Sequence, residues 1–357
     1  LTLHDFCVKL GMNEYYFPLE GLQKIMSEKK THEVNVASTI TNCLCQHSKG
    51  NQLHVVDIGG GKGYLSSLLA MEYKLKVLGV DSNCVNTHGA ALRSLKLQKY
   101  WQGIKNKKLI NMNDDLPNVS PEVLYKQVTE FVDEKTNLRE LVERAYPNDN
   151  FFGICMTGLH TCGNLASASL RIFNNNNDIK SILNIGCCYH HLSEEFLDPY
   201  TTNSNYGFPM SNFLCADKFS LGRNARMLSS QSIDRKIILK ESLSKSLLYR
   251  AVLQEMLQEH NYGYLDIQVG RIGAKCKTFS DYVMKVSKKL NLDFKLTNER
   301  LEEKIINYEE HWEKLQCYHA LKMCFAPILE LIIVLDRYLY LLENGHDKTY
   351  LIKLFDP

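Results

Sequence analysis

A glycine cluster directly after a short apolar stretch constrains the fold of this chain more than any other feature of its sequence. Residues 53–58 are apolar except for His54 and Asp57, which is typical of a buried strand. Residues 59–63 read Gly-Gly-Gly-Lys-Gly, and the apolar spacing of residues 64–71 predicts a helix. Such a turn lets a ligand approach the backbone and presents N–H groups at a helix start. The sequence therefore predicts a ligand-binding strand–turn–helix unit.

The segments around this unit continue the same alternation. Strands are expected over residues 53–58, 75–80, 151–159 and 181–187. Helices are expected over residues 64–71, 86–98 and 164–173. Strands that alternate with helices favour an α/β fold with a parallel, doubly wound sheet.

A length of 357 residues allows two domains or one domain with insertions, and we expect the second arrangement. The predicted parts are a helical segment at 1–50 and an α/β domain at 51–357, with helical insertions at 113–150 and 192–260 and a helical C-terminal part. The chain begins with Leu1 rather than Met, so we expect it to be part of a longer protein.

Composition excludes several classes of protein. Lys and Arg total 42 and Asp and Glu total 40, and a net charge of +2 is too small for a chain that coats nucleic acid by charge alone. The 12 cysteines fall short of the density of a disulfide scaffold, so we expect free thiols and an intracellular location, cytoplasmic or nuclear. The apolar residues 327–342 include Glu330, Asp336 and Arg337, which is too much charge for a membrane span. We expect no membrane association, and the sequence leaves the oligomeric state open.

The spacing of the glycines narrows the choice of ligand. A P-loop needs Ser or Thr after its lysine, but Lys62 is followed by Gly63, and the third position of a dinucleotide fingerprint is occupied by Tyr64. The remaining pattern is Asp-x-Gly-x-Gly-x-Gly, formed by Asp57, Gly59, Gly61 and Gly63. An acid at the strand end, with no pyrophosphate to hold, suits a cationic ligand such as the sulfonium and amino acid of S-adenosylmethionine.

A second acid supports this interpretation. Asp81 ends the next predicted strand, 20 residues after Gly61, where a carboxylate accepts hydrogen bonds from both ribose hydroxyls. The alternative is that the glycines only form a tight turn and that Asp81 caps the following helix. Asp114 or Asp115, after a possible short strand at 109–112, is expected to meet the adenine amine, or else to be a surface acid.

Two later strand ends carry a further group of reactive side chains. The residues are His160 and Cys162 after one strand and Cys188 and His190 after the other, and we expect them beside the methyl group of the cofactor. Either histidine could serve as a general base, a cysteine could act covalently, or the thiols could simply pack at the sheet edge. Zinc spacings such as CxxC are absent, and the adjacent Cys187 and Cys188 are poorly placed to bind one ion together, so we expect no metal site.

Several separated motifs together resemble the methyltransferase-like twenty-five family, which includes a member named for a ribosomal RNA adenine dimethylase domain. They are the glycine cluster and residues 29–34, 158–163, 186–190, 207–211, 225–228 and 335–337, so the resemblance covers about the whole chain. The His-x-Cys-Gly and Cys-Cys-x-His pieces are also similar to the tRNA 2′-O-methyltransferases that modify the acceptor stem.

This resemblance implies a seven-stranded, Rossmann-like methyltransferase that uses S-adenosylmethionine. We also expect Lys30, His32 and His160 near the cofactor, with a solvated helix start as the alternative for the lysines at 29 and 30. The acceptor is expected to be a macromolecule. RNA is slightly favoured over protein, because of the tRNA-enzyme similarity and the lysines within 105–108 and 285–289. The alternatives are a non-catalytic cofactor-binding scaffold and an NAD oxidoreductase. The absence of an Asn/Asp-Pro-Pro-Tyr motif argues against adenine N6 methylation, and relatives continue into a final strand where this chain ends, so we expect an unpaired sheet edge.

Overall fold

The computed structural model of the protein describes residues 2–10, 26–47, 52–109, 121–197, 206–233, 243–262, 269–270 and 272–355. The chain separates into two compact units, one formed by residues 1–230 and 328–356 and the other by residues 231–327. This division differs from the predicted boundary at residue 50. The N-terminal helix α2 (Glu28–Gln46) packs across the sheet with its buried face, so it belongs to the same unit as the strands.

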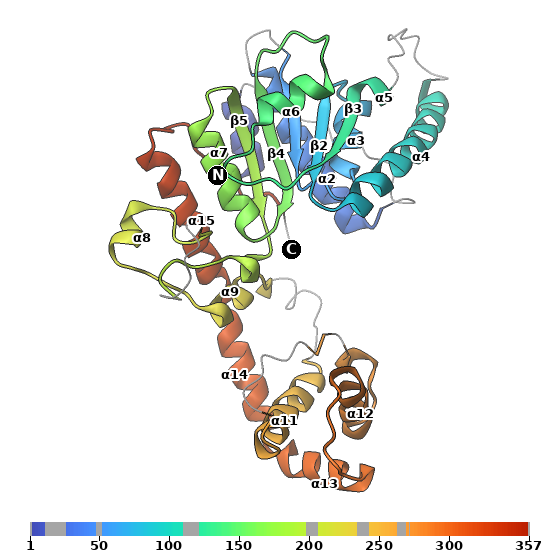
Figure 1. Ribbon diagram of the computed structural model, residues 1–357, viewed down its shortest axis with the longest axis vertical. Coiled ribbons are helices and arrows are strands. Elements are labelled where there is room, and N and C mark those ends of the chain that lie inside the picture. Colours follow the sequence, from blue (N-terminus) through green and yellow to red (C-terminus); the bar gives the residue numbers. More distant parts are fainter. Residues whose placement is uncertain are drawn as a thin grey trace. The chain divides into compact units, whose positions relative to one another are not determined.

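The larger unit is built on a sheet of five parallel strands among the residues described (Figure 1). Their order in the sheet is β3-β2-β1-β4-β5, and their bounds are β1 (His54–Ile58), β2 (Val77–Asp81), β3 (Tyr125–Thr129), β4 (Ile154–Thr161) and β5 (Ile179–Gly186). The chain adds strands on one side of β1 and then crosses to the other side, where β4 pairs with β1. The described part of the chain thus shows five of the seven strands that the resemblance implies.

Both faces of the sheet are covered, which confirms the doubly wound architecture. Side chains such as Val55 and Val77 point to one face and pack with α2 and α3 (Tyr64–Met71). Their neighbours Val56 and Leu78 point to the other face and pack with helices on that side, α6 (Leu138–Ala145) and α7 (Asn164–Asn175). Because side chains alternate along each strand, apolar groups pack against a layer of helices on both faces. The predicted helix at 64–71 matches α3 in both its bounds.

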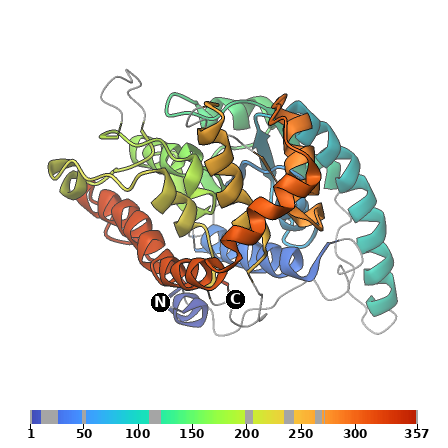
Figure 2. The same ribbon diagram turned by 90° about the horizontal axis from the view of Figure 1, so that it is seen from below.

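The predicted helical insertion at 113–150 is wrong in its central part. Helix α4 (Cys84–Leu109), the long helix that Figures 1 and 2 draw at the outer side of the larger unit, extends through Leu109. The third strand is β3, which follows the short α5 (Pro121–Leu124) and pairs with β2 from Val77↔Tyr125 to Asp81↔Thr129. An edge strand that reads Tyr-Lys-Gln-Val-Thr lacks the apolar run of a central strand, so periodicity did not reveal it.

The C-terminal half of the larger unit consists of short elements and one long helix. They are η2 (Tyr189–His191), α8 (Asn212–Ala216), α9 (Arg223–Ser229) and α15 (Ala326–Glu343). The N-terminal helix α1 (Leu3–Lys9) is also present, and Thr2 forms a parallel bridge with Lys353. Near it, Ile352, Leu354 and Phe355 pack against the core that contains α2, so the end of the described chain covers apolar surface.

The smaller unit is helical and has a core of its own. It contains α11 (Ser246–Glu259), η3 (Gly273–Lys275), α12 (Phe279–Leu290), α13 (Asn298–Glu309) and α14 (Trp312–Cys324). Phe279, Leu253 and Val286 lie at the centre of this core and are fully buried. The predicted insertion at 192–260 therefore has different limits, because α11 packs with α12 and α13 rather than ending an insertion.

One stretch, Trp312–Glu343, is long and apolar enough to cross a membrane by length and composition alone, and 17% of its most apolar window is buried. Core helices of folded domains pass the same test. In the second half of this stretch Asp336 and Arg337 are buried, at 1% and 8% exposure.

Asp336 connects α15 to the loop that precedes α8. Its carboxylate accepts hydrogen bonds from the backbone N–H groups of Met210 (2.8 Å) and Ser211 (2.9 Å) and from the Ser211 hydroxyl (2.7 Å). A buried carboxylate with several donors holds a loop firmly, because each donor would otherwise be desolvated without a partner.

Replacing Asp336 by Asn tests this connection. The amide would turn an N–H toward a backbone N–H, so we expect the free energy of unfolding to fall by about 1–3 kcal/mol. Urea unfolding followed by circular dichroism measures the change. Asp347→Asn, at an exposed position, is the matched control, and equal stability of the two variants would contradict the role of Asp336.

Candidate functional site

The glycine turn and the residues that end β4 lie on either side of the point where the order of the strands reverses, between β1 and β4. β1 has β2 and β3 on one side and β4 and β5 on the other. The turn after β1 and the segment after β4 therefore lie next to each other at the carboxyl ends of the strands. Ligands of open α/β sheets bind at this place, beyond the carboxyl ends of the strands.

The glycine turn, residues 59–63, adopts a conformation that favours glycine. Gly59, Gly61 and Gly63 have φ angles of 70°, 54° and 70°. The N–H groups of Gly59 and Gly60 donate to the Val80 carbonyl at 2.8 and 3.2 Å, which fixes the turn to the end of β2. A side chain at Gly63 would collide with the Tyr125 hydroxyl, so this end of the turn is packed.

At Gly61 the turn is open. A Cβ atom there would meet nothing closer than the Gly59 carbonyl oxygen at 3.7 Å and an Asp81 carboxylate oxygen at 3.9 Å. The backbone is therefore accessible on the side that faces Asp81, as the predicted close approach of a ligand requires.

The structure brings Asp81 to the glycine turn. Its Oδ2 accepts the Gly61 N–H at 3.0 Å, and its Oδ1 accepts the N–H of Asn83 (2.8 Å) and the side-chain amide of Asn86 (3.2 Å). The same carboxylate therefore also stabilises the start of α4, which is the alternative role that the sequence left open for Asp81. Asp81 is only partly buried, so its second carboxylate edge is accessible.

Asp57, in contrast, is buried at 1% exposure and holds the fold of the turn. The Ser66 hydroxyl donates to its Oδ2 at 2.5 Å, which links β1 to the first turn of α3. Burial raises the pKa of Asp57 to about 6, although Ser66 and Lys30 favour the ionised form. Asp57 therefore supports the glycine turn from inside the fold.

A group that the sequence analysis missed joins α2 to the end of β4. Glu33 is buried, and its carboxylate lies 3.1 Å from Nε2 of His160 and 3.6 Å from Nζ of Lys30. Burial opposes ionisation, but His160, Lys30 and Lys29 outweigh it and lower the pKa of Glu33. The spacing of Lys29 and Lys30 to Glu33, four and three residues, was the available signal. His160 has a φ angle of 71°, a conformation uncommon outside glycine.

The other predicted cofactor residues have different surroundings. The His32 ring packs edge-on against Phe355 at 5.9 Å, and no contact with the glycine turn is present for it among the described residues. Asp114 and Asp115 lie outside the described residues. The acid that follows β3, beside Asp81 in the sheet, is Glu130, whose backbone N–H donates to the Asp81 carbonyl at 3.1 Å. It was missed because β3 itself was not predicted.

Three cysteines meet at the carboxyl ends of β4 and β5. Sγ of Cys187 lies 3.4 Å from Sγ of Cys162 and 3.6 Å from Sγ of Cys188, and we call these three residues the cysteine cluster. Cys187 was not among the predicted site residues. A hydrogen bond with Cys187 lowers the pKa of Cys162 to about 6, with His160 and His191 contributing in the same direction.

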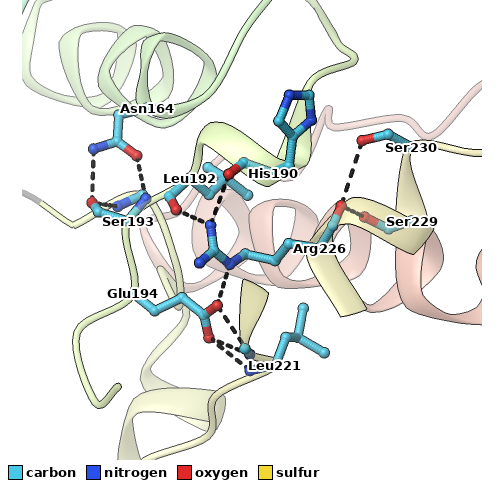
Figure 3. Close-up of polar contacts among 11 residues, drawn as sticks. Asn164, His190, Leu192, Ser193, Glu194, Leu221, Arg226, Ser229 and Ser230 are labelled. Carbon is cyan, nitrogen blue, oxygen red and sulfur yellow. Dashed lines mark hydrogen bonds and ion pairs between the residues drawn. The ribbon is translucent and has the colours of Figure 1, made fainter. Parts of the chain in front are cut away.

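A buried ion pair fixes the turn that carries His190 (Figure 3). The Arg226 guanidinium donates to the carbonyls of His190, at 3.2 Å, and Leu192, and it pairs with Glu194. Glu194 also accepts the N–H groups of Leu221 and Gly222, and both charged side chains are at most 8% exposed. Burial lowers the pKa of His190, with the nearby positive groups acting in the same sense. Sequence patterns gave no sign of this pairing, which joins residues 32 positions apart.

A separate hollow lies at the opposite, amino ends of the strands and is lined by His54, Lys76 and Asp149 among others. Both basic groups pair with Asp149, at 3.1 and 2.5 Å. The charges of Lys76 and Asp149 offset one another, and none of the predicted site residues that the structure describes lines this hollow.

Comparison with known proteins identifies the part of the chain that is similar to a methyltransferase domain. A family model described as a methyltransferase domain matches residues 29–195, which contain the glycine turn, Asp81 and the cysteine cluster. The chain is 31% identical to "Probable methyltransferase-like protein 25" of Homo sapiens, over 94% of this chain and 73% of that protein. It is 29% identical to the protein of the same name from Mus musculus, with the same coverage. The alignments, of 451 and 447 residues, are longer than this chain of 357 residues, so both relatives contain insertions that it lacks.

The pKa of Asp57 predicts how stability depends on pH. Because the pKa rises from 3.8 to about 6 on folding, the folded protein binds the extra proton more tightly, and stability falls as the pH rises between these values. Asn does not titrate. The free energy of unfolding of Asp57→Asn, minus that of the unmodified protein, should therefore rise by about 2–3 kcal/mol from pH 4 to pH 7. Urea unfolding at several pH values measures both curves. Parallel curves would contradict a raised pKa.

Proposed function

Because the chain belongs to the methyltransferase-like protein 25 family, we propose that it transfers a methyl group from S-adenosylmethionine to a macromolecule. The methyltransferase activity follows from the family and its domain. The methyl donor, the acceptor and the roles of individual residues are our proposal.

The observation that carries the choice of donor is the contact of Asp81 with the Gly61 N–H at 3.0 Å. It places a carboxylate beside an open stretch of backbone, so adenosine could lie against the turn with its ribose hydroxyls toward Asp81. Oδ2 has a lone pair that no contact uses, and the Asn86 amide is the donor that a second hydroxyl would displace from Oδ1. An acid at this position also binds the ribose of a dinucleotide, so the preference for S-adenosylmethionine over NAD rests on Tyr64, which interrupts the dinucleotide glycine pattern.

The acceptor should lie beyond β4, where His160 and the turn with His190 border the site. S-adenosylmethionine, when bound, supplies an electrophilic methyl group on a sulfonium. Transfer depends mainly on the alignment of nucleophile, methyl carbon and sulfur, so few side chains need to act chemically. Glu33 holds His160 in position, and Arg226 holds the backbone of His190. These two histidines remain the proposed general bases.

RNA is the acceptor that we favour. Lys62 is exposed in the glycine turn, and the Arg93 side chain donates to its carbonyl at 3.2 Å. Lys29 is exposed beside Glu33, the partner of His160. Positive side chains around an adenosine site suit a phosphate backbone. The similarity of the two cysteine-containing motifs to tRNA 2′-O-methyltransferases points the same way.

Substitution of Asp81 tests the cofactor site. Removing a charged hydrogen-bonding partner of the ribose costs about 1.5–3 kcal/mol, so Asp81→Ala should weaken binding of S-adenosylhomocysteine about 10- to 100-fold. Isothermal titration calorimetry measures the affinity, with Asp347→Ala, an exposed aspartate, as the control. Equal affinity of all three proteins would place the ligand elsewhere, and thermal unfolding of each verifies that it is folded.

Label transfer identifies the acceptor. We expect tritium from labelled S-adenosylmethionine to enter macromolecules of a cell extract, and RNase rather than protease should release it. Release by protease alone would make the acceptor a protein. Binding of the cofactor without label transfer would favour the non-catalytic scaffold.

A further inference from the structure

The proposed methyl transfer assigns no role to the cysteine cluster, so its arrangement calls for an explanation of its own. We propose that Cys162, Cys187 and Cys188 bind a zinc ion through three thiolates, with the fourth position of the ion open to solvent. The proposal rests on the positions of the sulfur atoms and on a buried cation beside them. It does not depend on the proposed cofactor.

The distances between the sulfur atoms fit a tetrahedral site. A Zn–S bond of about 2.3 Å places the sulfur atoms of a tetrahedron about 3.8 Å apart. The observed separations of 3.4 and 3.6 Å are close to this value, and all three atoms lie within 4.8 Å of one another. They are far longer than a disulfide bond of about 2.05 Å, so the three sulfurs are gathered without being bonded.

The local backbone overcomes the adjacency that argued against metal binding by Cys187 and Cys188. β5 ends at Gly186, and at Cys188 the chain leaves the extended conformation, with φ −94° and ψ 69°. Neighbouring side chains therefore do not point to opposite faces as they would in a strand. Cys162 approaches from the end of β4, so two adjacent parallel strands supply the ligands.

A buried guanidinium stands beside the cluster and would balance its charge. Three thiolates and one Zn²⁺ carry a net charge of −1. The Arg337 guanidinium packs directly against Gly186, the residue before Cys187, and lies 5.6 Å from the centre of the Tyr189 ring. Its Nε is buried and has no hydrogen-bond partner in the part of the chain that the structure describes. The Asp336 carboxylate also favours this buried charge, and a zinc–thiolate group at Cys187 would add a further anion beside it.

The number of protein ligands indicates an open site. Among the described residues, no histidine nitrogen or carboxylate joins the three sulfur atoms at the same close range. Cys162 is exposed, so water or another small ligand can complete the tetrahedron. Zinc sites with three protein ligands and one exchangeable position are typical of catalytic rather than structural zinc. Binding converts three thiols into thiolates and releases their protons, with no change of oxidation state.

Metal content of the full chain tests the proposal directly. Protein purified without chelator from zinc-supplemented cells should contain about one zinc per chain by mass spectrometry of the metal. Cys162→Ser and Cys188→Ser should each lower it at least tenfold, because loss of one of three ligands removes a third of the coordination. Cys84→Ser, at an exposed cysteine outside the cluster, should retain full occupancy. Equal zinc in all four proteins, or one equivalent of copper instead, would overturn the zinc assignment.

A measurement on the unmodified protein covers the case in which a serine variant fails to fold. Alkylation with iodoacetamide, mapped by peptide mass spectrometry, should be slow at the cysteine cluster with Zn²⁺ and fast after chelation, while Cys84 reacts equally in both. A Cys162–Cys187 disulfide in freshly reduced protein, or alkylation that Zn²⁺ leaves unchanged, would contradict the site. Binding of S-adenosylhomocysteine to the same samples is measured separately, so a failure of either proposal is recognised without the other.

Discussion

The parallel direction of all five strands is the constraint on which the rest of the structure depends. It brings the glycine turn after β1, Asp81 at the end of β2 and the cysteine cluster after β4 and β5 to the same side of the sheet, at the carboxyl ends of the strands. Because helices cover both faces of the sheet, backbone and polar side chains are accessible at these carboxyl ends. The strand order determines where the candidate site residues lie, and their hydrogen-bond and ionic partners determine their protonation.

Buried charges hold the segments that surround these carboxyl ends. Glu33 fixes His160, the pair of Arg226 and Glu194 fixes the turn with His190, and Asp336 fixes the loop before α8. Each carboxylate accepts several donors, which offsets the cost of removing it from water. Loops that lack regular secondary structure are thereby given defined positions beside the site. Arg337 differs from these groups, since its Nε has no hydrogen-bond partner among the described residues, although the Asp336 carboxylate and Cys187 both favour its charge.

The sequence predicted the central strands, their helices and the place of Asp81, because apolar runs and glycine spacing report local structure. It missed β3, a polar edge strand, and with it Glu130 beside Asp81, while the predicted Asp114 and Asp115 lie outside the described residues. It also missed Glu33 and Cys187, whose contacts with His160 and Cys162 join residues distant in sequence. Pairings across 127 residues, as between Glu33 and His160, depend on the packing of α2 on β4, which periodicity does not encode.

A crystal structure of the chain with S-adenosylhomocysteine tests the central claim, that the edge formed by the glycine turn and Asp81 holds the methyl donor. The account predicts adenosine against the backbone of Gly61, with ribose hydroxyls within hydrogen-bond distance of the Asp81 carboxylate and the sulfur atom directed toward the end of β4. Ligand bound at another surface, with Asp81 still joined only to Gly61, Asn83 and Asn86, would contradict it.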